Sequence, residues 1–314
     1  MTHYRTLIDG HIAAWVNALP KGGLYAPMAY LMDLPAKRVR PALVILGCEL
    51  FGGRAENVLD EALGIELFHN FTLMHDDIMD AAPLRRGKPT VHEKWNVNTA
   101  ILSGDALLVK AYQLMAKRAD VARIFSKHAL EVCEGQQLDM DFEQRSDVTT
   151  VDYTEMIRLK TAVLLACSLR VGAAIAGANT EDSDRIGAFG EHTGLAFQLR
   201  DDLLDAFGDT AKTGKQQGGD LRAGKKTFLL IHGLELSAAN KRNELHEELA
   251  KPVDERDVPR MLLALEELGV HKEAERAIQA EDRKAAEALE AIGVPEDRKA
   301  PLLALSAQLM ARSY

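Results

Sequence analysis

Several features that would indicate other kinds of protein are scarce or missing in this sequence. Aromatic residues make up only 5% of the 314 residues, and long strand-like alternations of apolar and polar residues do not occur. With a formal net charge of −9, the chain lacks the basic excess that general nucleic-acid binding requires. The N-terminus has no basic start followed by an apolar run, so we predict no signal peptide.

Cysteine is also scarce. Cys48, Cys133 and Cys167 are odd in number and lack the spacing of metal ligands, so we interpret them as reduced core residues of a cytoplasmic protein. The most membrane-like stretch, 161–178, contains Arg170 and small residues throughout. This composition favours a buried helix of a soluble bundle over a membrane span.

Alanine and leucine dominate the composition, and 47% of the residues are hydrophobic, which is enough for a large core. Because no short repeat or shift in composition marks a boundary, we predict one all-helical domain over 1–314. Apolar periodicity predicts helices over 1–18, 24–34, 42–51, 55–80, 93–117, 121–143, 152–178 and 182–207, and helical structure from 228 to 314 with breaks near 252, 269 and 293–295.

Three aspartates lie inside one of these apolar patterns. Residues four apart share a helical face, so Asp76 and Asp80 project together, with Asp77 about 100° round the helix and His69 on the same face. Carboxylates this close repel each other, and a bound divalent cation would remove the repulsion. Oxygen-only ligands favour Mg²⁺, which bridges one or two carboxylates to substrate phosphates. For a single motif, a solvated acidic patch at a helix end is the alternative.

The acidic pattern occurs a second time. Asp201, Asp202 and Asp205 begin 125 positions after Asp76, again among apolar residues, and Gln198 shares a helical face with Asp201 and Asp205. Two such helices facing each other would hold a cluster of metal ions between six carboxylates. That arrangement would be suited to binding and ionising a diphosphate.

Cations accompany the two motifs in four segments. These segments are Lys37 to Arg40 before a helix, Arg85 and Arg86 after the first motif, Lys160 with Thr161, and the glycine-rich loop 208–226 with Lys215 and Lys225. Cations at a helix start oppose the helix dipole, and a bound anion would relieve that conflict. The alternatives are that residues 37–40 form an exposed basic turn, that Lys160 is a surface lysine, and that the loop 208–226 is disordered.

Together these segments resemble the trans-isoprenyl diphosphate synthases, the family of farnesyl and geranylgeranyl diphosphate synthases. The match runs from Lys37 to Thr227 in family order: Lys-Arg-x-Arg-Pro, two aspartate-rich motifs, Arg-Arg-Gly, Lys-Thr, Phe-Gln-x-x-Asp-Asp and a Gly-Lys loop. The first block departs from the family at Ala36, where glycine is usual. The resemblance implies a single bundle of long helices around a deep apolar cavity, usually as a homodimer.

The resemblance also implies a role for each matched residue. The diphosphate of isopentenyl diphosphate would be held by Lys37, Arg40, His69 and Arg86. The allylic diphosphate would be surrounded by Arg85, Lys160, Thr161, Gln198, Lys215 and Lys225. Its oxygens would bridge about three Mg²⁺ ions held by Asp76, Asp77, Asp80, Asp201, Asp202 and Asp205. The catalytic set would be Asp76, Asp77, Asp80, Asp201, Asp202 and Lys160.

The implied reaction is head-to-tail addition of isopentenyl diphosphate to an allylic carbocation, with the released pyrophosphate as the base. Phe71 would form the floor of the cavity with Thr72 beside it, and the pattern is most similar to that of C20 enzymes; a C15 product and a plain core role for Phe71 are alternatives.

Two other functions stay open at this point. A class I terpene cyclase or head-to-head synthase would not need the cations Lys37, Arg40 and Arg86. A non-catalytic regulatory subunit of a prenyl synthase typically loses one aspartate motif, whereas this chain has both.

Overall fold

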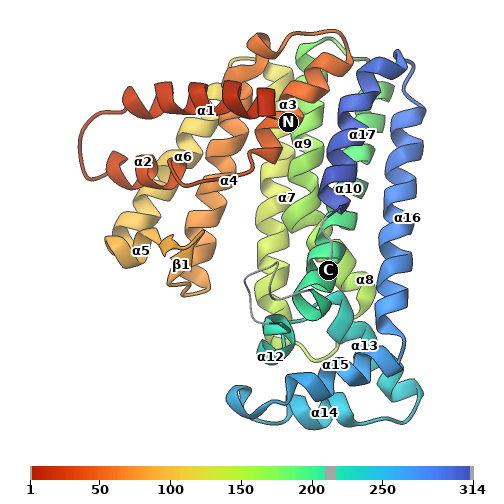
Figure 1. Cartoon of the computed structure of the whole chain (residues 1–314). Helices are drawn as coiled ribbons and strands as arrows, with labels where there is room; N and C mark the ends of the chain where they lie inside the picture. The colour runs from red at the N-terminus through yellow and green to blue at the C-terminus, as the bar shows by residue number, and fades with distance from the viewer. Residues whose placement is uncertain (1, 209–216, 312–314) are drawn as a thin grey trace. The chain divides into compact units, whose positions relative to one another are not determined.

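The computed structural model describes residues 2–208 and 217–311 (Figure 1). Apart from turns, loops and one two-stranded hairpin, these residues form helices, which confirms the predicted all-α class. The chain groups into two compact units: unit 1 comprises Met1–Lys127, Cys167–Ile186 and Val294–Lys299, and unit 2 comprises His128–Ala166, Gly187–Gly293 and Ala300–Tyr314. The single domain over 1–314 stays a prediction. Within the described residues, no helix combines the length and apolar character needed to cross a membrane.

Unit 1 is built around two helices that run side by side, α4 and α6 (Figure 1). Its elements are α1 Thr2–Asn17, α2 Tyr25–Met32, α3 Val39–Leu50, the 3₁₀ turn η1 Ala55–Val58, α4 Leu59–Met79, β1 Leu84–Arg85, β2 Lys88–Pro89, α5 Val91–Lys94 and α6 Val97–Met115. Large side chains such as Met28, Ile45, Phe68 and Leu107 are fully buried. The unbroken helix predicted over 93–117 is therefore two helices, because the chain leaves helical geometry at Trp95.

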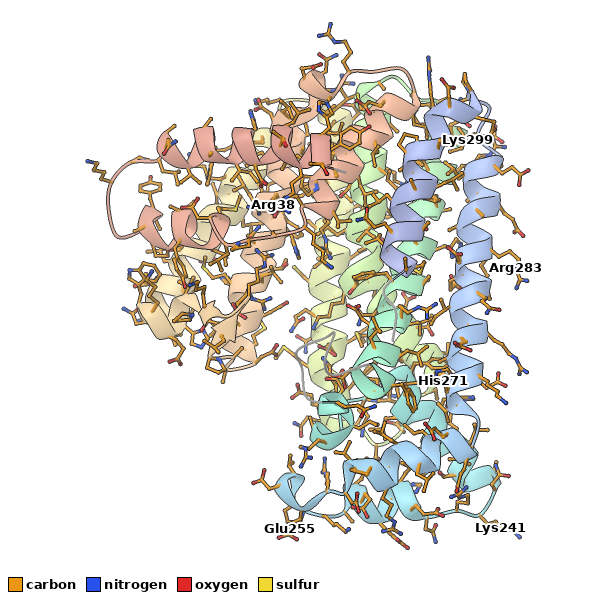
Figure 2. All side chains as sticks on the ribbon, in the orientation of Figure 1. Arg38, Lys241, Glu255, His271, Arg283 and Lys299 are labelled. Atoms are coloured by element: carbon orange, nitrogen blue, oxygen red, sulfur yellow. The ribbon has the colours of Figure 1, made fainter. Side chains whose placement is uncertain are left out.

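Arg38, labelled in Figure 2, is a structural residue at the start of α3. It is 6% exposed, and its guanidinium donates to Glu66 at 2.6 Å, to Asp9 at 3.0 Å and to the carbonyl oxygen of Met32 at 2.7 Å. Its backbone is left-handed, with φ of 52°, a conformation that costs a non-glycine residue about 1 kcal/mol. These three contacts hold the residue there and bind the chain before α3 to α1, α2 and α4.

Four helices continue from one unit into the other: α7 Ala119–Gln144, α9 Val163–Ile175, α10 Thr180–Phe207 and α17 Glu296–Met310. Unit 2 also contains α8 Thr150–Ile157, the π-helical segment η2 Arg158–Ala162, α12 Gly219–Ala223, α13 Phe228–Ala239, α14 Glu244–Leu249, η3 Val253–Glu255, α15 Val258–Glu267 and α16 Val270–Glu290. Its core includes Tyr153, Leu203, Leu230 and Met261. The helix expected from Asp152 begins two residues earlier, at Thr150, because Thr149 and Asp152 form a reciprocal capping box.

The cysteine interpretation is right for two of three residues. Cys48 and Cys167 are buried, whereas Cys133 is exposed, so its assignment to the core is wrong. Cys133 shares the outward face of α7 with Leu130 and Gln137, which lie three and four residues away and are also exposed.

Candidate active site

The first aspartate motif occupies the last turn of α4, where its three carboxylates have different surroundings. Asp77 is 2% exposed, and both of its oxygens accept from Arg85 Nε at 2.8 Å while Arg85 Nη2 lies 2.6 Å from Oδ1. Asp76 is half-buried and Asp80 is exposed. Asp77 and Arg85 therefore form a two-pronged ion pair, which is the strongest geometry for these groups.

A tight hairpin brings Arg85 back to α4. Leu84 pairs with Pro89 and Arg85 pairs with Lys88, leaving Arg86 and Gly87 as the two-residue turn. Both turn residues have positive φ, 53° at Arg86 and 74° at Gly87, as the favoured two-residue hairpin turns require. The sequence predicted a loop here and missed the hairpin. The two adjacent arginines therefore have different surroundings: the Arg85 side chain binds Asp77, whereas Arg86 is exposed.

A cationic cluster lies where α3 meets α4. Arg40 Nη1 donates to His69 Nε2 at 3.2 Å, and an arginine only donates, so this imidazole nitrogen is the acceptor. Burial, then the charges of Arg40 and Arg86, hold the pKa of His69 well below its usual value, so the ring is neutral at pH 7. Burial also lowers the pKa of Arg40 to about 10, which leaves it charged. Lys37 lies exposed on the loop before α3.

One atom of the cluster indicates what it could bind. Arg40 Nε is buried and has no hydrogen-bond partner within the described part of the chain. Buried N–H groups are nearly always paired, and a positively charged surrounding favours an anionic acceptor. The cluster of Arg40, His69 and Arg86 therefore fits a phosphate-bearing ligand.

In unit 2, Lys160 lies in the π-helical segment that follows α8. Its ammonium pairs with Asp139 of α7 at 2.5 Å. The two segments approach closely because Gly135 has no side chain: a Cβ there would lie 2.2 Å from the backbone nitrogen of Lys160. Short π-helical segments are rare and occur often at functional sites. The sequence predicted a continuous helix through Lys160 and did not indicate this change of winding.

The second aspartate motif lies at the end of α10 and is connected to its neighbours by hydrogen bonds. Asp202 is 5% exposed and accepts from Tyr153 O–H at 2.5 Å, Gln198 Nε2 at 3.4 Å and the backbone N–H of Phe228 at 3.4 Å. Thr161 in turn donates to Gln198 at 3.4 Å. Burial raises the pKa of Asp202 to about 7.

Sequence reasoning missed Tyr153. The available signal was a tyrosine on the apolar side of a helix, since a buried tyrosine hydroxyl usually has a partner.

The last carboxylate of the second motif fixes the segment that follows it. Asp205 Oδ2 accepts from the backbone N–H of Asp220 at 2.9 Å, and its carbonyl oxygen accepts from Gly218 at 2.7 Å. These contacts hold the start of α12 against the end of α10. Lys225 follows α12 and is exposed. Lys215, which the sequence assigned to the same loop, lies outside the described residues.

The two residues predicted to control product length, Thr72 and Phe71, lie four and five residues before Asp76, a little over one helical turn. Thr72 Oγ1 donates to the carbonyl oxygen of His69 at 2.8 Å within α4. Phe71 lies between two rings, with centroid distances of 5.6 Å to Phe68 and 4.7 Å to His75. Phe71 is thus held on both sides by aromatic contacts.

The carboxylates do not form a complete metal site by themselves. Within residues 2–208 and 217–311, no three His, Cys, Asp or Glu side chains lie close enough together to hold an ion. Mg²⁺ usually keeps several waters and binds through one or two carboxylates together with substrate phosphates. The oxygen-only donors of the two motifs therefore fit Mg²⁺ when a diphosphate supplies the remaining ligands.

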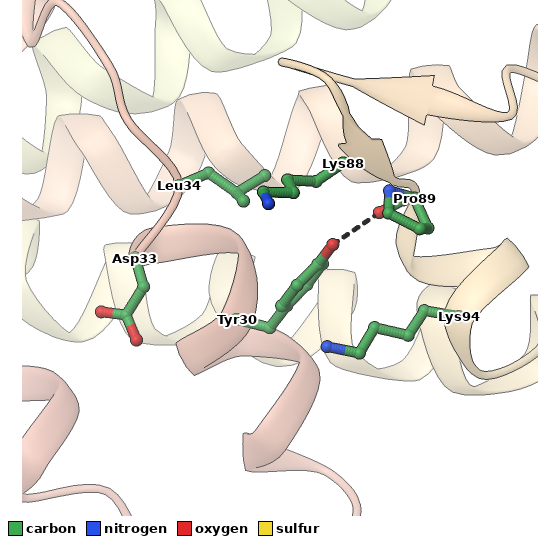
Figure 3. A pocket seen from close by; sticks show the side chains of 6 residues that line it. All are labelled: Tyr30, Asp33, Leu34, Lys88, Pro89 and Lys94. Carbon is green, nitrogen blue, oxygen red and sulfur yellow. Dashed lines mark hydrogen bonds between the residues drawn. The ribbon is translucent and has the colours of Figure 1, made fainter.

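Unit 1 also has an open surface pocket of about 510 Å³ (Figure 3). It is lined by Tyr30, Asp33, Leu34, Lys88, Pro89 and Lys94. Tyr30 donates to the carbonyl oxygen of Pro89 at 2.8 Å, and the Lys94 ammonium lies 3.7 Å from the centre of the Tyr30 ring. Since no predicted site residue lines it, we do not assign this pocket to the active site.

The chain is similar over most of its length to known proteins. Residues 21–265 match the family model described as polyprenyl synthetase. A geranylgeranyl diphosphate synthase of Methanosarcina mazei is 43% identical over 219 residues, 68% of each chain. A solved geranylgeranyl pyrophosphate synthase, 43% identical, matches 100% of this chain and 99% of its own with a TM-score of 0.93. The synthase from Corynebacterium glutamicum, complexed with isoprenyl diphosphate and magnesium, is 28% identical with a TM-score of 0.87 over 98% of each chain.

Proposed function

This chain belongs to the polyprenyl synthetase family of trans-prenyltransferases, and from that premise we propose that it extends an allylic diphosphate with isopentenyl diphosphate to a C20 product and pyrophosphate. The relatives named as geranylgeranyl diphosphate synthases support the C20 length. A cyclase or head-to-head synthase is disfavoured, because the chain has a second cationic site beside its aspartates.

The observation that carries the proposal is the buried, unpaired Nε of Arg40 in the cluster with His69 and Arg86. Isopentenyl diphosphate does not ionise, so its diphosphate needs a site made of cations rather than catalytic metal ions. We propose that Arg40, His69, Arg86 and Lys37 form that site. Neutral His69 would accept from Arg40 through Nε2 and donate to a phosphate oxygen through Nδ1.

For the allylic substrate, we propose that both aspartate motifs bind Mg²⁺ around one diphosphate, with Asp76, Asp77, Asp80, Asp201, Asp202 and Asp205 as the carboxylates. Bound Mg²⁺ would neutralise the negative charge that develops on the leaving diphosphate. The Corynebacterium glutamicum synthase, whose structure contains magnesium, supports this choice of metal. Asp80 is the most accessible of the first motif, whereas Asp77 and Asp202 already accept hydrogen bonds.

The remaining side chains would orient the substrate and hold its charge. Arg85, fixed by Asp77, and Lys160, fixed by Asp139, would each donate to allylic diphosphate oxygens from a preset position. Thr161, Gln198, Lys215 and Lys225 would complete the donors around it. Proton loss from the condensed carbocation would go to the released pyrophosphate, because the described site offers no side chain placed for that role.

The direct test is product analysis by mass spectrometry. Purified protein with Mg²⁺, isopentenyl diphosphate and dimethylallyl, geranyl or farnesyl diphosphate should give longer diphosphates that end at C20. A product formed from one allylic substrate alone would favour the cyclase, and no extension of any primer would overturn the proposal. Activity only in mixture with another synthase would indicate a regulatory subunit.

Arg40→Ala separates the two substrate sites. Loss of its charge-assisted hydrogen bonds should raise KM for isopentenyl diphosphate about 10- to 100-fold and leave KM for the allylic substrate within about twofold. Arg276→Ala is the control, because this arginine pairs only on the surface, with a side chain 71% exposed. Equal rises in both KM values would refute a separate site at Arg40.

We also propose that the protein works in the cytoplasm as a homodimer that pairs through α6. Leu102 and Val109 lie seven residues apart on one face of α6 and are 60% and 56% exposed. Light scattering should give twice the 34.5 kDa chain mass, and Leu102→Glu should give monomer. A monomeric wild-type protein at micromolar concentration would refute this pairing.

A further inference from the structure

His75 is the residue before the first aspartate motif, and its ring lies against α6. It lies one helical turn after Phe71, so the two side chains share a face of α4. Their ring centroids are 4.7 Å apart at an interplanar angle of 66°, the edge-to-face arrangement that aromatic rings prefer. The imidazole therefore covers one side of Phe71.

A hydrogen bond to the neighbouring helix fixes the imidazole. His75 Nε2 lies 3.2 Å from the carbonyl oxygen of Ile101 on α6. A carbonyl oxygen only accepts, so Nε2 is the donor and carries a proton. The carboxylate of Asp105, also on α6, lies 3.9 Å from the same nitrogen. The ring is thus held by a hydrogen bond from Nε2 to α6 and by its aromatic contact with Phe71.

Gly104 provides the space for this ring. It lies inside α6, where glycine weakens a helix, and its φ is not positive, so no turn requires it. A Cβ at Gly104 would lie 2.3 Å from His75 Nε2 and 2.5 Å from Cδ2. The imidazole therefore occupies the position that any other side chain on α6 would take.

On the opposite side, Phe71 contacts a run of rings. Phe68 lies 5.6 Å from Phe71, Phe125 lies 5.2 Å from Phe68, and Tyr112 lies 5.0 Å from Phe125, measured between centroids. Phe68 and Phe125 are at most 1% exposed, so these rings cannot yield without disturbing the core of unit 1. Phe71 is therefore bounded by core rings on one side and by His75 on another.

We propose that His75 is a positioning residue that holds Phe71 in place as the floor for the growing prenyl chain, with Gly104 as the socket for its ring. This inference rests on the proposed function and on the expectation from the sequence that Phe71 forms the floor of the cavity. Specificity for length would then depend on α6 as well as on the residues before the aspartates. Loss of the imidazole or of its socket would let the Phe71 ring rotate and would admit a longer chain.

The test compares product lengths for four variants with farnesyl diphosphate as primer. In His75→Ala and in Gly104→Ala, the amount of product longer than C20, relative to the amount of C20 product, should rise about two- to tenfold. This is the change in relative rate that corresponds to the energy of one edge-to-face aromatic contact. Gly104→Ala acts from α6, 28 positions from Asp76, so it changes the floor without altering the residue beside a proposed metal ligand. Phe71→Ala is the positive control, and Gly10→Ala, a helical glycine with open space around it, is the matched control for the added methyl group.

The double variant separates positioning from general damage. In Gly104→Ala with His75→Ala, the clash between the two positions is gone, so thermal stability should exceed that of Gly104→Ala while products stay long. If Gly104→Ala does not fold, His75→Ala and His75→Gln carry the test. Products unchanged in His75→Ala and Gly104→Ala, with Phe71→Ala lengthened, would make His75 a packing residue only. An unchanged spectrum for Phe71→Ala would overturn the floor itself, and no extension by the wild-type protein would overturn the proposed function.

Discussion

Asp76 and Asp77 are neighbours in one motif, yet the structure predicts that replacing them has different consequences for stability. Asp77 and Arg85 form three nitrogen–oxygen contacts of 2.6 to 2.8 Å, and the side chains are only 3% and 24% exposed. Asp77→Ala would leave the Arg85 guanidinium without this partner, next to the turn of its hairpin. Removing one partner lowers the free energy of unfolding by about 3–5 kcal/mol for a buried ion pair and by less than about 1 kcal/mol for an exposed one. Because the pair of Asp77 and Arg85 is partly buried, Asp77→Ala should lower it by about 2 kcal/mol.

The matched comparison is Asp76→Ala. It relieves carboxylate repulsion, so it should change the free energy of unfolding by less than about 0.5 kcal/mol while turnover falls by orders of magnitude. Asp77→Ala should also cut turnover and in addition lower Tm by about 3 °C, the shift that about 2 kcal/mol produces in a chain of 314 residues. Thermal unfolding of the metal-free protein measures this difference directly.

A double-mutant cycle with Arg85→Ala completes the experiment. If the pair stabilises the hairpin, Asp77→Ala and Arg85→Ala should show a coupling energy of about 2 kcal/mol. Equal stability of Asp76→Ala and Asp77→Ala, or a coupling energy near zero, would refute the assignment of Asp77 as the anchor of Arg85.

Three further predictions follow from other parts of the site. In titration calorimetry, Mg²⁺ alone should bind weakly, and pyrophosphate should tighten its binding at least about tenfold, because the carboxylates need phosphate oxygens to complete the metal ligands; equal affinity in both conditions would contradict this. Gly135→Ala should lower the free energy of unfolding by about 1–3 kcal/mol and reduce turnover, because its Cβ would lie 2.2 Å from the backbone nitrogen of Lys160. Denaturant unfolding and steady-state kinetics measure these effects. A stability equal to that of Gly10→Ala would contradict the prediction. The pKa of His69 is lower in the folded protein than in the unfolded chain, so the unfolded chain binds a proton first as the pH falls. The free energy of unfolding should therefore decrease by up to about 1.4 kcal/mol per pH unit below pH 6.5. His69→Gln should remove this dependence, and identical profiles of Tm against pH for the variant and the wild-type protein would refute the prediction.

Periodicity and spacing predicted much of the helical structure. The apolar pattern placed the helices that carry both aspartate motifs within a few residues of their observed bounds, because a helix that buries one face must repeat apolar residues every three or four positions. The approach of Lys160 to α7 at Gly135 depended on backbone contact between segments and was not predictable from either segment alone.

The sequence by itself determined the family of the chain and the candidate residues for its chemistry, which are the two aspartate motifs and the cations around them. Only the tertiary structure decided how each side chain is used. In the folded chain Asp77 forms an ion pair with Arg85, Arg38 is buried in a structural role, and Arg40 Nε is buried without a hydrogen-bond partner among the described residues. The structure also shows that Gly104 of α6 leaves the space that the His75 ring of α4 occupies. Such pairings depend on distances between separate helices, which helical periodicity does not encode.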